Sequence, residues 1–313
     1  MKYFILLASL SITGLLASFN PGPKKLAFNH QESKKAEFAN RIKAPSHVII
    51  VVEENHGYDQ IIGSDSAAYI NRLAREGAVF TNSHGVTHPS QPNYLALFSG
   101  TTQGVTGDQC LEDSTSFTTP NLAISLIRKG YTFKGFAQTM PSSGYLKCYY
   151  KNSKITDQML YGRKHCPWVN WQGTKENQIP ASLSQPITEF PKDFNKLPTV
   201  AFVIPDMDHD MHNIGGPGDS AAMVRGDRWL RRNLGAYIKW AKTHNSLFIL
   251  TYDEDQFTAI NRIPTIFVGA NIKRGKYDEK ITHYSVLKTL EDMYGLDFTH
   301  NNDVLVIKDV WKK

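Results

Sequence analysis

Several features that would narrow the class of this protein are missing or scarce. Its 313 residues include only three cysteines, Cys110, Cys148 and Cys166, and their spacing does not match a metal-binding motif. Basic residues form no stripe interleaved with aromatic residues, so a nucleic acid polymer is not expected as a partner. Internal repeats, low-complexity segments and an evident interdomain linker are absent too. The composition is otherwise ordinary for a globular protein, with 41% hydrophobic and 20% charged residues, and it allows a large core.

The longest apolar run lies at the N-terminus. Met1 and Lys2 precede an apolar segment that ends near Ala17, and polar sequence follows. This pattern is typical of a signal peptide at residues 1–18, because the run is too short to span a membrane comfortably. We therefore expect an exported protein, periplasmic or secreted, with no membrane span after signal cleavage; an uncleaved anchor is the alternative. Residues 19–44 are polar and lysine-rich, which indicates a flexible arm.

Export also bears on the three cysteines. An oxidising compartment favours disulfides, so three cysteines indicate one disulfide and one free thiol. The sequence leaves three pairings open.

From about residue 45 the chain alternates strand and helix patterns. Continuous β-branched or apolar runs at 47–52, 199–204 and 246–251 predict strands that are buried on both faces. Helical periodicity predicts helices at 66–77, 121–129, 220–243 and 283–294. This alternation predicts one α/β domain at 45–313, a three-layer sandwich with a largely parallel central sheet. An aperiodic, aromatic-rich stretch at about 140–191 indicates an insertion that walls the site.

Polar clusters follow each of the three predicted central strands. They contain Glu54 and Asn55, then Asp206, Asp208 and His212, and finally Asp253 and Glu254. The carboxyl ends of parallel strands meet at one edge of a sheet, so these clusters should converge. Carboxylates with a few imidazoles suit a divalent metal ion: zinc, manganese, magnesium or calcium. Each cluster alone could be a helix cap or a solvated turn, and the convergence of three favours a metal site.

Ser90 stands between two prolines, Pro89 and Pro92, ahead of an apolar run. Pro92 is tolerated in the first turn of a helix, so the stretch predicts a loop that becomes a helix at or just after Ser90. A hydroxyl at a helix N-terminus can attack phosphorus while the helix end stabilises the phosphate anion. The alternative is that Ser90 only caps the helix.

Six segments together resemble the phosphoesterase family that contains bacterial acid phosphatases and phospholipases C, within the alkaline phosphatase-like superfamily. In chain order they read HVIIVVEENHGYDQIIG, THPSQPNYLALFSGTTQGVTGD, RKHCPW, VIPDMDHDMHN, LFILTYDED and THYSVLKTLEDMYGL. The resemblance covers about residues 45–295 and is specific because several motifs match in order. It implies an alkaline phosphatase-like fold and a metal-dependent phosphate-ester hydrolase with a phosphoserine intermediate.

The resemblance also implies roles for individual residues. Ser90 would be the nucleophile, and Asn93 would help to bind phosphate. Two histidines, His165 and His212, would contact the phosphate or donate a proton. The first metal would lie among Glu54, Asn55, Asp253 and Glu254, and a second metal could use Asp206 or Asp208 with His212 and His283.

Two departures from relatives refine the expectation. Tyr94 stands where sulfatases carry an arginine, which argues against a formylglycine enzyme. Glu254 replaces a histidine that many relatives place after the aspartate, which favours a harder, oxygen-rich metal site. We expect a phosphomonoester hydrolase of the acid phosphatase type that acts on a small phosphorylated substrate, which the net charge of +6 would attract weakly. The alternatives are a phosphodiesterase or phospholipase C and, from another class, a non-catalytic exported binding protein.

Overall fold

Strand β1 (His47–Glu53) lies at the centre of the sheet and is buried on both faces. Val48, Ile50 and Val52 pack into the hydrophobic cluster on one side, and Ile49 and Val51 pack into the cluster on the other. Successive side chains of a strand point to opposite faces, so an uninterrupted apolar run requires a layer on each face. The strand predicted at 47–52 is confirmed.

Eight strands form the main sheet in the order β11-β2-β10-β9-β1-β8-β4-β7. β1 pairs in parallel with both β8 and β9, and only β10 runs antiparallel to its neighbours. The largely parallel sheet predicted from the sequence is therefore confirmed. The strands are β2 (Ala78–Phe80), β4 (Phe133–Ala137), β7 (Ser184–Pro186), β8 (Val200–Ile204), β9 (Ser246–Tyr252), β10 (Thr265–Gly269) and β11 (Gly275–Tyr277).

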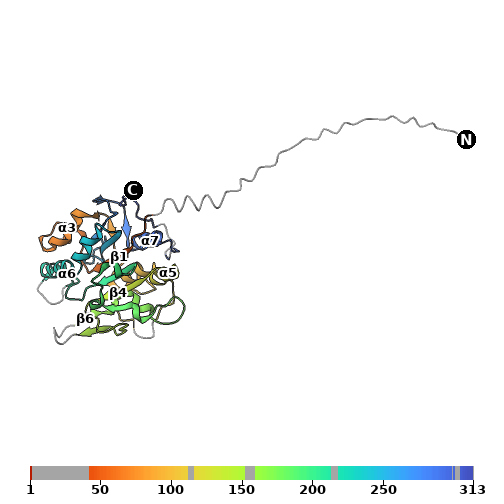
Figure 1. Cartoon of the computed structure of the whole chain (residues 1–313), viewed down its shortest axis with the longest axis horizontal. Coiled ribbons are helices and arrows are strands. Elements are labelled where there is room, and N and C mark those ends of the chain that lie inside the picture. The colour runs from red at the N-terminus through yellow and green to blue at the C-terminus, as the bar shows by residue number, and fades with distance from the viewer. Residues whose placement is uncertain are drawn as a thin grey trace. The chain divides into compact units, whose positions relative to one another are not determined.

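Helices cover both faces of this sheet. Figure 1 shows α3 and α6 on one side of β1, and α5 and α7 on the other. Apolar residues of α4, α5 and α7 belong to one hydrophobic cluster, and those of α3 and α6 belong to the second, which gives the expected three layers. The helices are α2 (Tyr58–Ile61), α3 (Ala68–Glu76), α4 (Ser90–Ser99), α5 (Leu122–Arg128), α6 (Gly218–Ala241) and α7 (His283–Tyr294).

The stretch expected to be an insertion, at about 140–191, is joined to the main sheet. It contains the hairpin of β5 (Tyr149–Lys151) and β6 (Met159–Gly162), but its strand β7 pairs in parallel with β4. Trp168, also from this stretch, packs on β4 so closely that a Cβ on Gly135 would lie 2.0 Å from its ring. The stretch therefore completes one edge of the sheet as well as covering it.

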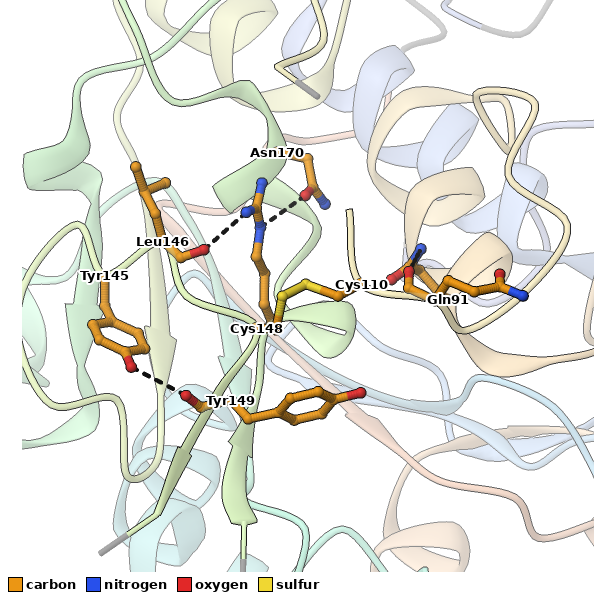
Figure 2. Close-up of a disulfide and its surroundings, with 9 residues drawn as sticks. Gln91, Cys110, Tyr145, Leu146, Cys148, Tyr149 and Asn170 are labelled. Carbon is orange, nitrogen blue, oxygen red and sulfur yellow. Dashed lines mark hydrogen bonds between the residues drawn. A yellow bond between two sulfur atoms is a disulfide. The ribbon is translucent and has the colours of Figure 1, made fainter. Parts of the chain in front are cut away.

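A disulfide between Cys110 and Cys148 links the loop after α4 to this stretch (Figure 2), whereas Cys166 is a free, buried thiol. This selects one of the three pairings that the sequence left open. The carbonyl oxygen of Cys148 accepts a hydrogen bond from the backbone N–H of Arg163 at 2.8 Å. The disulfide thus holds the segment that leads to His165 against the loop that follows α4.

The computed structural model describes residues 1, 42–111, 116–151, 159–212, 218–297, 299 and 304–312. The predicted signal peptide and most of the predicted arm lie outside these residues. Two short strands, β3 (Ser83–His84) and β12 (Ile281–Thr282), form a separate pair. Within the described residues, no helix is both long enough and apolar enough to cross a bilayer.

Candidate active site

The central strands deliver their polar ends to one edge of the sheet. β1 and β9 pair in register up to Glu53 and Tyr252, so Glu54 and Asp253 follow at the same level. The backbone N–H of Glu54 in turn donates to the carbonyl oxygen of Asp210, which follows β8, at 2.7 Å. The convergence predicted from parallel pairing is present in the structure.

Ser90 is the first residue of α4, and the N-cap position belongs to Pro89. Its hydroxyl does not cap the helix but points into the carboxyl-lined edge. The Oγ atom lies 3.3 Å from Glu54 Oε2, 3.3 Å from Asn55 Oδ1 and 3.1 Å from Glu254 Oε1. A hydroxyl carries one proton and cannot satisfy three acceptors at once, so two of these oxygens need a further donor or a cation.

Asp253 provides a second sign that a cation fits here. Its Oδ1 accepts from the backbone N–H of Asn55 at 3.1 Å and of Glu254 at 2.7 Å. Its Oδ2 is buried without a hydrogen-bond partner among the described residues. Burial and the charge of Glu54 raise the pKa of Asp253 well above its usual value, and burial raises the pKa of Glu254 to about 7. Crowded buried carboxyls of this kind are stabilised when a divalent cation binds to them.

Glu54 is held by two aromatic side chains. The Tyr94 hydroxyl donates to Glu54 Oε1 at 2.8 Å, and His165 Nε2 lies 2.9 Å from the same oxygen. The His165 ring stacks on the Tyr94 ring with centroids 5.1 Å apart. Burial alone would raise the pKa of Glu54, but the nearby His165 and Lys164 lower it below its usual value.

Asp210 is a site residue that the sequence did not single out. Its Oδ2 lies 3.9 Å from His165 Nδ1, and burial and the charge of Glu54 raise its pKa. Within the described residues, Glu54, His165 and Asp210 form a group with ligand atoms within 4.8 Å of one another, which could hold a metal ion. The only signal in the sequence was the alternating acidic run from Asp206 to Asp210, which does not say which carboxyl turns inward.

The contacts of His165 differ from those expected of a proton donor to the leaving group. The side chain is 1% exposed and lies between Glu54 and Asp210. Burial lowers the pKa of His165, which favours the neutral imidazole. This position suits a metal ligand or a support for Glu54.

His88, which the sequence did not single out either, supports Glu254. Its Nε2 is hydrogen-bonded to the carbonyl oxygen of Thr258 at 3.1 Å and therefore carries a proton. Its Nδ1 contacts Glu254 Oε2. A hydrogen bond between these two atoms needs one proton, carried either by the imidazole of His88 or by the carboxyl of Glu254. The His88 ring also stacks on Phe257 with centroids 4.7 Å apart.

Asn93, the expected phosphate contact, is engaged in the loop before α4. Its Oδ1 accepts from the backbone N–H groups of Val86 and Thr87 at 2.9 and 3.0 Å. Its Nδ2 donates to the carbonyl oxygens of Thr87 and Pro89 at 2.8 and 3.1 Å. A phosphate contact by Asn93 would have to replace some of these bonds, and the observed contacts give it a role in shaping the loop.

The residues expected to hold a second metal are not brought together. Asp206 Oδ1 contacts His209 Nδ1 at 2.6 Å, and Asp208 Oδ1 is paired with Arg225 Nε at 3.1 Å. The remaining member, His283, is buried and donates from Nε2 to the carbonyl oxygen of Tyr252 at 2.8 Å; burial lowers its pKa to about 4. These separate partners explain why the expected set does not form.

His212, by contrast, lies near the nucleophile. Its backbone N–H donates to Asp210 Oδ1 at 2.9 Å, and its half-buried side chain lines a cavity that Asn55 also lines. Of the two histidines expected to contact substrate, His212 lines this cavity, whereas His165 is buried.

A cation lies beside the N-terminus of α4. Lys164 Nζ is 2.6 Å from Asp108 Oδ2, and Asp108 Oδ1 accepts from the backbone N–H of Gln91 at 2.9 Å. Lys164 is therefore held close to the residue that follows Ser90. The sequence showed Lys164 only as part of the RKHCPW segment and did not indicate this contact.

Comparison with known proteins places the chain among phosphate-ester hydrolases. Residues 64–297 match the Phosphoesterase family. The phosphatidylinositol-3-phosphatase of Mycobacterium tuberculosis is 44% identical over 87% of this chain and 85% of its own length. The phosphate-repressible acid phosphatase of Penicillium chrysogenum is 31% identical over 72% of this chain. The match covers 54% of that relative, which is about half of its length.

Solved structures agree on the fold. A protein of the alkaline phosphatase superfamily from Vibrio parahaemolyticus matches with a TM-score of 0.54 at 16% identity, over 82% of this chain and 68% of that chain. A sulfatase of Pseudoalteromonas sp. matches with a TM-score of 0.54 at 14% identity, over 90% of this chain and 76% of that chain. The resemblance read from the motifs is thus confirmed: the chain belongs to the phosphoesterase family, has the alkaline phosphatase-like fold and is a phosphoric ester hydrolase.

Proposed function

We propose that this protein is a metal-dependent phosphomonoesterase of the acid phosphatase type, with Ser90 as its nucleophile. The observation that carries the proposal is the position of Ser90 Oγ, at the start of α4 and within 3.1 to 3.3 Å of three oxygens from Glu54, Asn55 and Glu254. A structural serine at a helix start would direct its hydroxyl to the backbone of its own helix.

Four residues are proposed to hold the cation: Glu54, Asn55, Asp253 and Glu254. Their oxygen-rich set suits a hard divalent ion, and His165 with Asp210 forms an adjoining group. When bound, such an ion would neutralise the carboxyls and lower the pKa of the Ser90 hydroxyl. Tyr94 and His88 then act as supports that orient Glu54 and Glu254.

The reaction assigned to these residues has two displacements. Ser90 Oγ forms a bond to phosphorus, its proton leaves toward Glu254, and the bond from phosphorus to the leaving alcohol oxygen breaks. His212 donates a proton to that oxygen, because it has access to the adjoining cavity whereas His165 is enclosed. Water then attacks the phosphoserine and gives a proton to His212, the bond from phosphorus to Ser90 Oγ breaks, and Glu254 returns its proton to that oxygen, which releases inorganic phosphate and restores Ser90.

The start of α4 and Lys164 are proposed to stabilise the phosphoryl oxygens. The positive end of the α4 dipole favours an anion, although the N–H of Gln91 already donates to Asp108 and Pro92 has no N–H. Lys164 adds a full positive charge within reach of the same helix end through its contact with Asp108. Burial would lower the pKa of Lys164, but the charge of Glu54 and its bond to Asp108 raise it, so it stays protonated.

Monoesters are the proposed substrate class, because the relatives that match are named phosphatases. The name of the most fully aligned of these relatives adds the phosphorylated headgroup of an inositol lipid as a candidate. The diesterase alternative is tested by comparing turnover of a monoester, a diester and phosphatidylcholine. We also infer export, which the signal-like segment at 1–18 and the Cys110–Cys148 disulfide support.

Replacing Ser90 by alanine tests the nucleophile. We expect Ser90→Ala to lower kcat on p-nitrophenyl phosphate by about a thousandfold or more, because the covalent route is lost. Thr87→Ala, which removes the nearest other serine or threonine hydroxyl along the sequence, is the matched control and should stay active. Acid quenching of the wild type during turnover should yield a phosphorylated Ser90 peptide by mass spectrometry; full activity of Ser90→Ala would refute the assignment.

A further inference from the structure

A cavity of about 270 Å³ lies beside the nucleophile. Asn55 forms part of its wall, and Asn55 Oδ1 is 3.3 Å from Ser90 Oγ. A single side chain, that of Asn55, thus contacts both the cavity and the reacting hydroxyl. The cavity is therefore next to the site of the proposed reaction. The volume is below the range of about 300–1,000 Å³ that holds drug-sized ligands, so its occupant is small, on the scale of one ring.

Phe257 presents an aromatic ring at the mouth of this cavity. Its side chain is 63% exposed, and its φ of 65° lies in the left-handed region that few non-glycine residues adopt. The turn is held on both sides, since Asp255 Oδ1 accepts from the backbone N–H of Thr258 and Asn261 Oδ1 accepts from that of Asp255, both at 2.8 Å. With one face of the ring stacked on His88, the loop keeps an apolar surface exposed beside the cavity.

His56 supplies a buried hydrogen-bond acceptor in the same cavity. Its Nδ1 is 3.0 Å from the carbonyl oxygen of Glu54, and a carbonyl only accepts, so Nδ1 carries the proton. In the neutral imidazole Nε2 is then an acceptor; His56 is 3% exposed, and its Nε2 has no partner among the described residues. Asp219, whose carboxylate is also an acceptor, lines the cavity as well.

We propose that this cavity is the leaving-group subsite and that it takes a hydroxyl-rich ring alcohol, which stacks on Phe257 and donates a hydroxyl proton to His56 Nε2. A buried acceptor without a partner costs free energy that a hydroxyl donor recovers. An aromatic face packs against the C–H side of such a ring while its hydroxyls reach the polar wall.

This inference rests on the proposed role of Ser90, and a matched pair of substrates tests it. Cyclohexyl phosphate and myo-inositol 1-phosphate both release a six-membered ring alcohol, and they differ in the ring hydroxyls. We expect the wild type at pH 7 to prefer the inositol ester in kcat/KM by at least about tenfold, because the cyclohexyl ring offers no hydroxyl donor to His56 Nε2.

Two variants on one loop separate the subsite from a general effect. Phe257→Ala should raise KM for myo-inositol 1-phosphate about tenfold with little change in kcat. The control is Ile260→Ala, which removes a side chain that is 68% exposed and lines a different cavity, and it should leave KM unchanged.

Three results would overturn the proposed subsite. The wild type could hydrolyse the two ring esters equally well, or it could cleave p-nitrophenyl phosphate but neither ring ester. The Phe257→Ala and Ile260→Ala variants could also show identical kinetics. Each of these results leaves the proposed function standing if Ser90→Ala is inactive. Activity of Ser90→Ala would instead remove the proposed function itself.

Discussion

Glu291 in α7 makes the stability of the fold depend on pH in a direction that can be worked out from its contacts. Its side chain is fully buried; Oε1 accepts from the backbone N–H and the hydroxyl of Thr299 at 3.0 and 2.7 Å. Its Oε2 has no partner among the described residues, and burial raises the pKa of Glu291 to about 7 from its usual 4.5.

The folded state therefore binds this proton more tightly than the unfolded chain does. The resulting stabilisation is complete below pH 4.5 and is lost as the pH rises through 7. A rise of about 2.5 units at 1.36 kcal/mol each corresponds to about 3 kcal/mol. Glu291→Gln keeps an acceptor oxygen for Thr299 and removes the ionisation, so its stability relative to the wild type should grow by about that amount between pH 4.5 and 8.

Urea unfolding of both proteins at several pH values measures this difference, and groups that titrate equally in both cancel. Glu189→Gln at an exposed position serves as the control and should show a difference that does not change with pH. The reasoning is refuted if the difference between wild type and Glu291→Gln is constant across this range, or if the wild type gains stability relative to the variant as the pH rises.

Further predictions concern the phosphate, the insertion and the metal. Lys164→Met should raise the inhibition constant of inorganic phosphate about tenfold, because a charge-assisted contact is lost, and Lys164→Arg should restore much of it; unchanged inhibition would exclude the contact. Gly135→Ala should destabilise the fold by about 2 kcal/mol or more in urea unfolding, because its Cβ would meet the Trp168 ring at 2.0 Å; wild-type stability would show that the ring can move away. Chelation should abolish phosphatase activity, and added divalent ions should restore it in an order that identifies the metal; a fully active metal-free protein would reject the metal role.

Much of the fold could be predicted because its signals are local. The run at 48–52 has no polar residue, which predicts a strand with a layer on each face, and α7 spans the predicted range of 283–294. Strand β7 could not be predicted, because Ser184, Gln185 and Pro186 carry no strand pattern. They form a strand only because β4 offers an unpaired edge at that position.

The candidate site divides in the same way. Ser90, Glu54 and Glu254 could be named in advance, because each lies within three residues after a predicted strand or at the start of a predicted helix. Asp210 could not be ranked above Asp206 and Asp208, since the three alternate in one loop after β8. The bond between the Glu54 N–H and the Asp210 carbonyl oxygen fixes the path of that loop, and it joins residues far apart in the sequence.

The sequence by itself determined the layered fold, because the spacing of hydrophobic residues is a local property of each strand and helix. It also determined the chemistry at the ends of the strands, because parallel pairing places those ends on one edge of the sheet. Only the tertiary structure decided which partners surround that chemistry. His165 contacts Glu54, and Asn93 is hydrogen-bonded within its own loop. Phe257 lines a cavity beside Ser90. These outcomes depend on loop paths and burial, where each polar group takes the partner that the fold brings within reach.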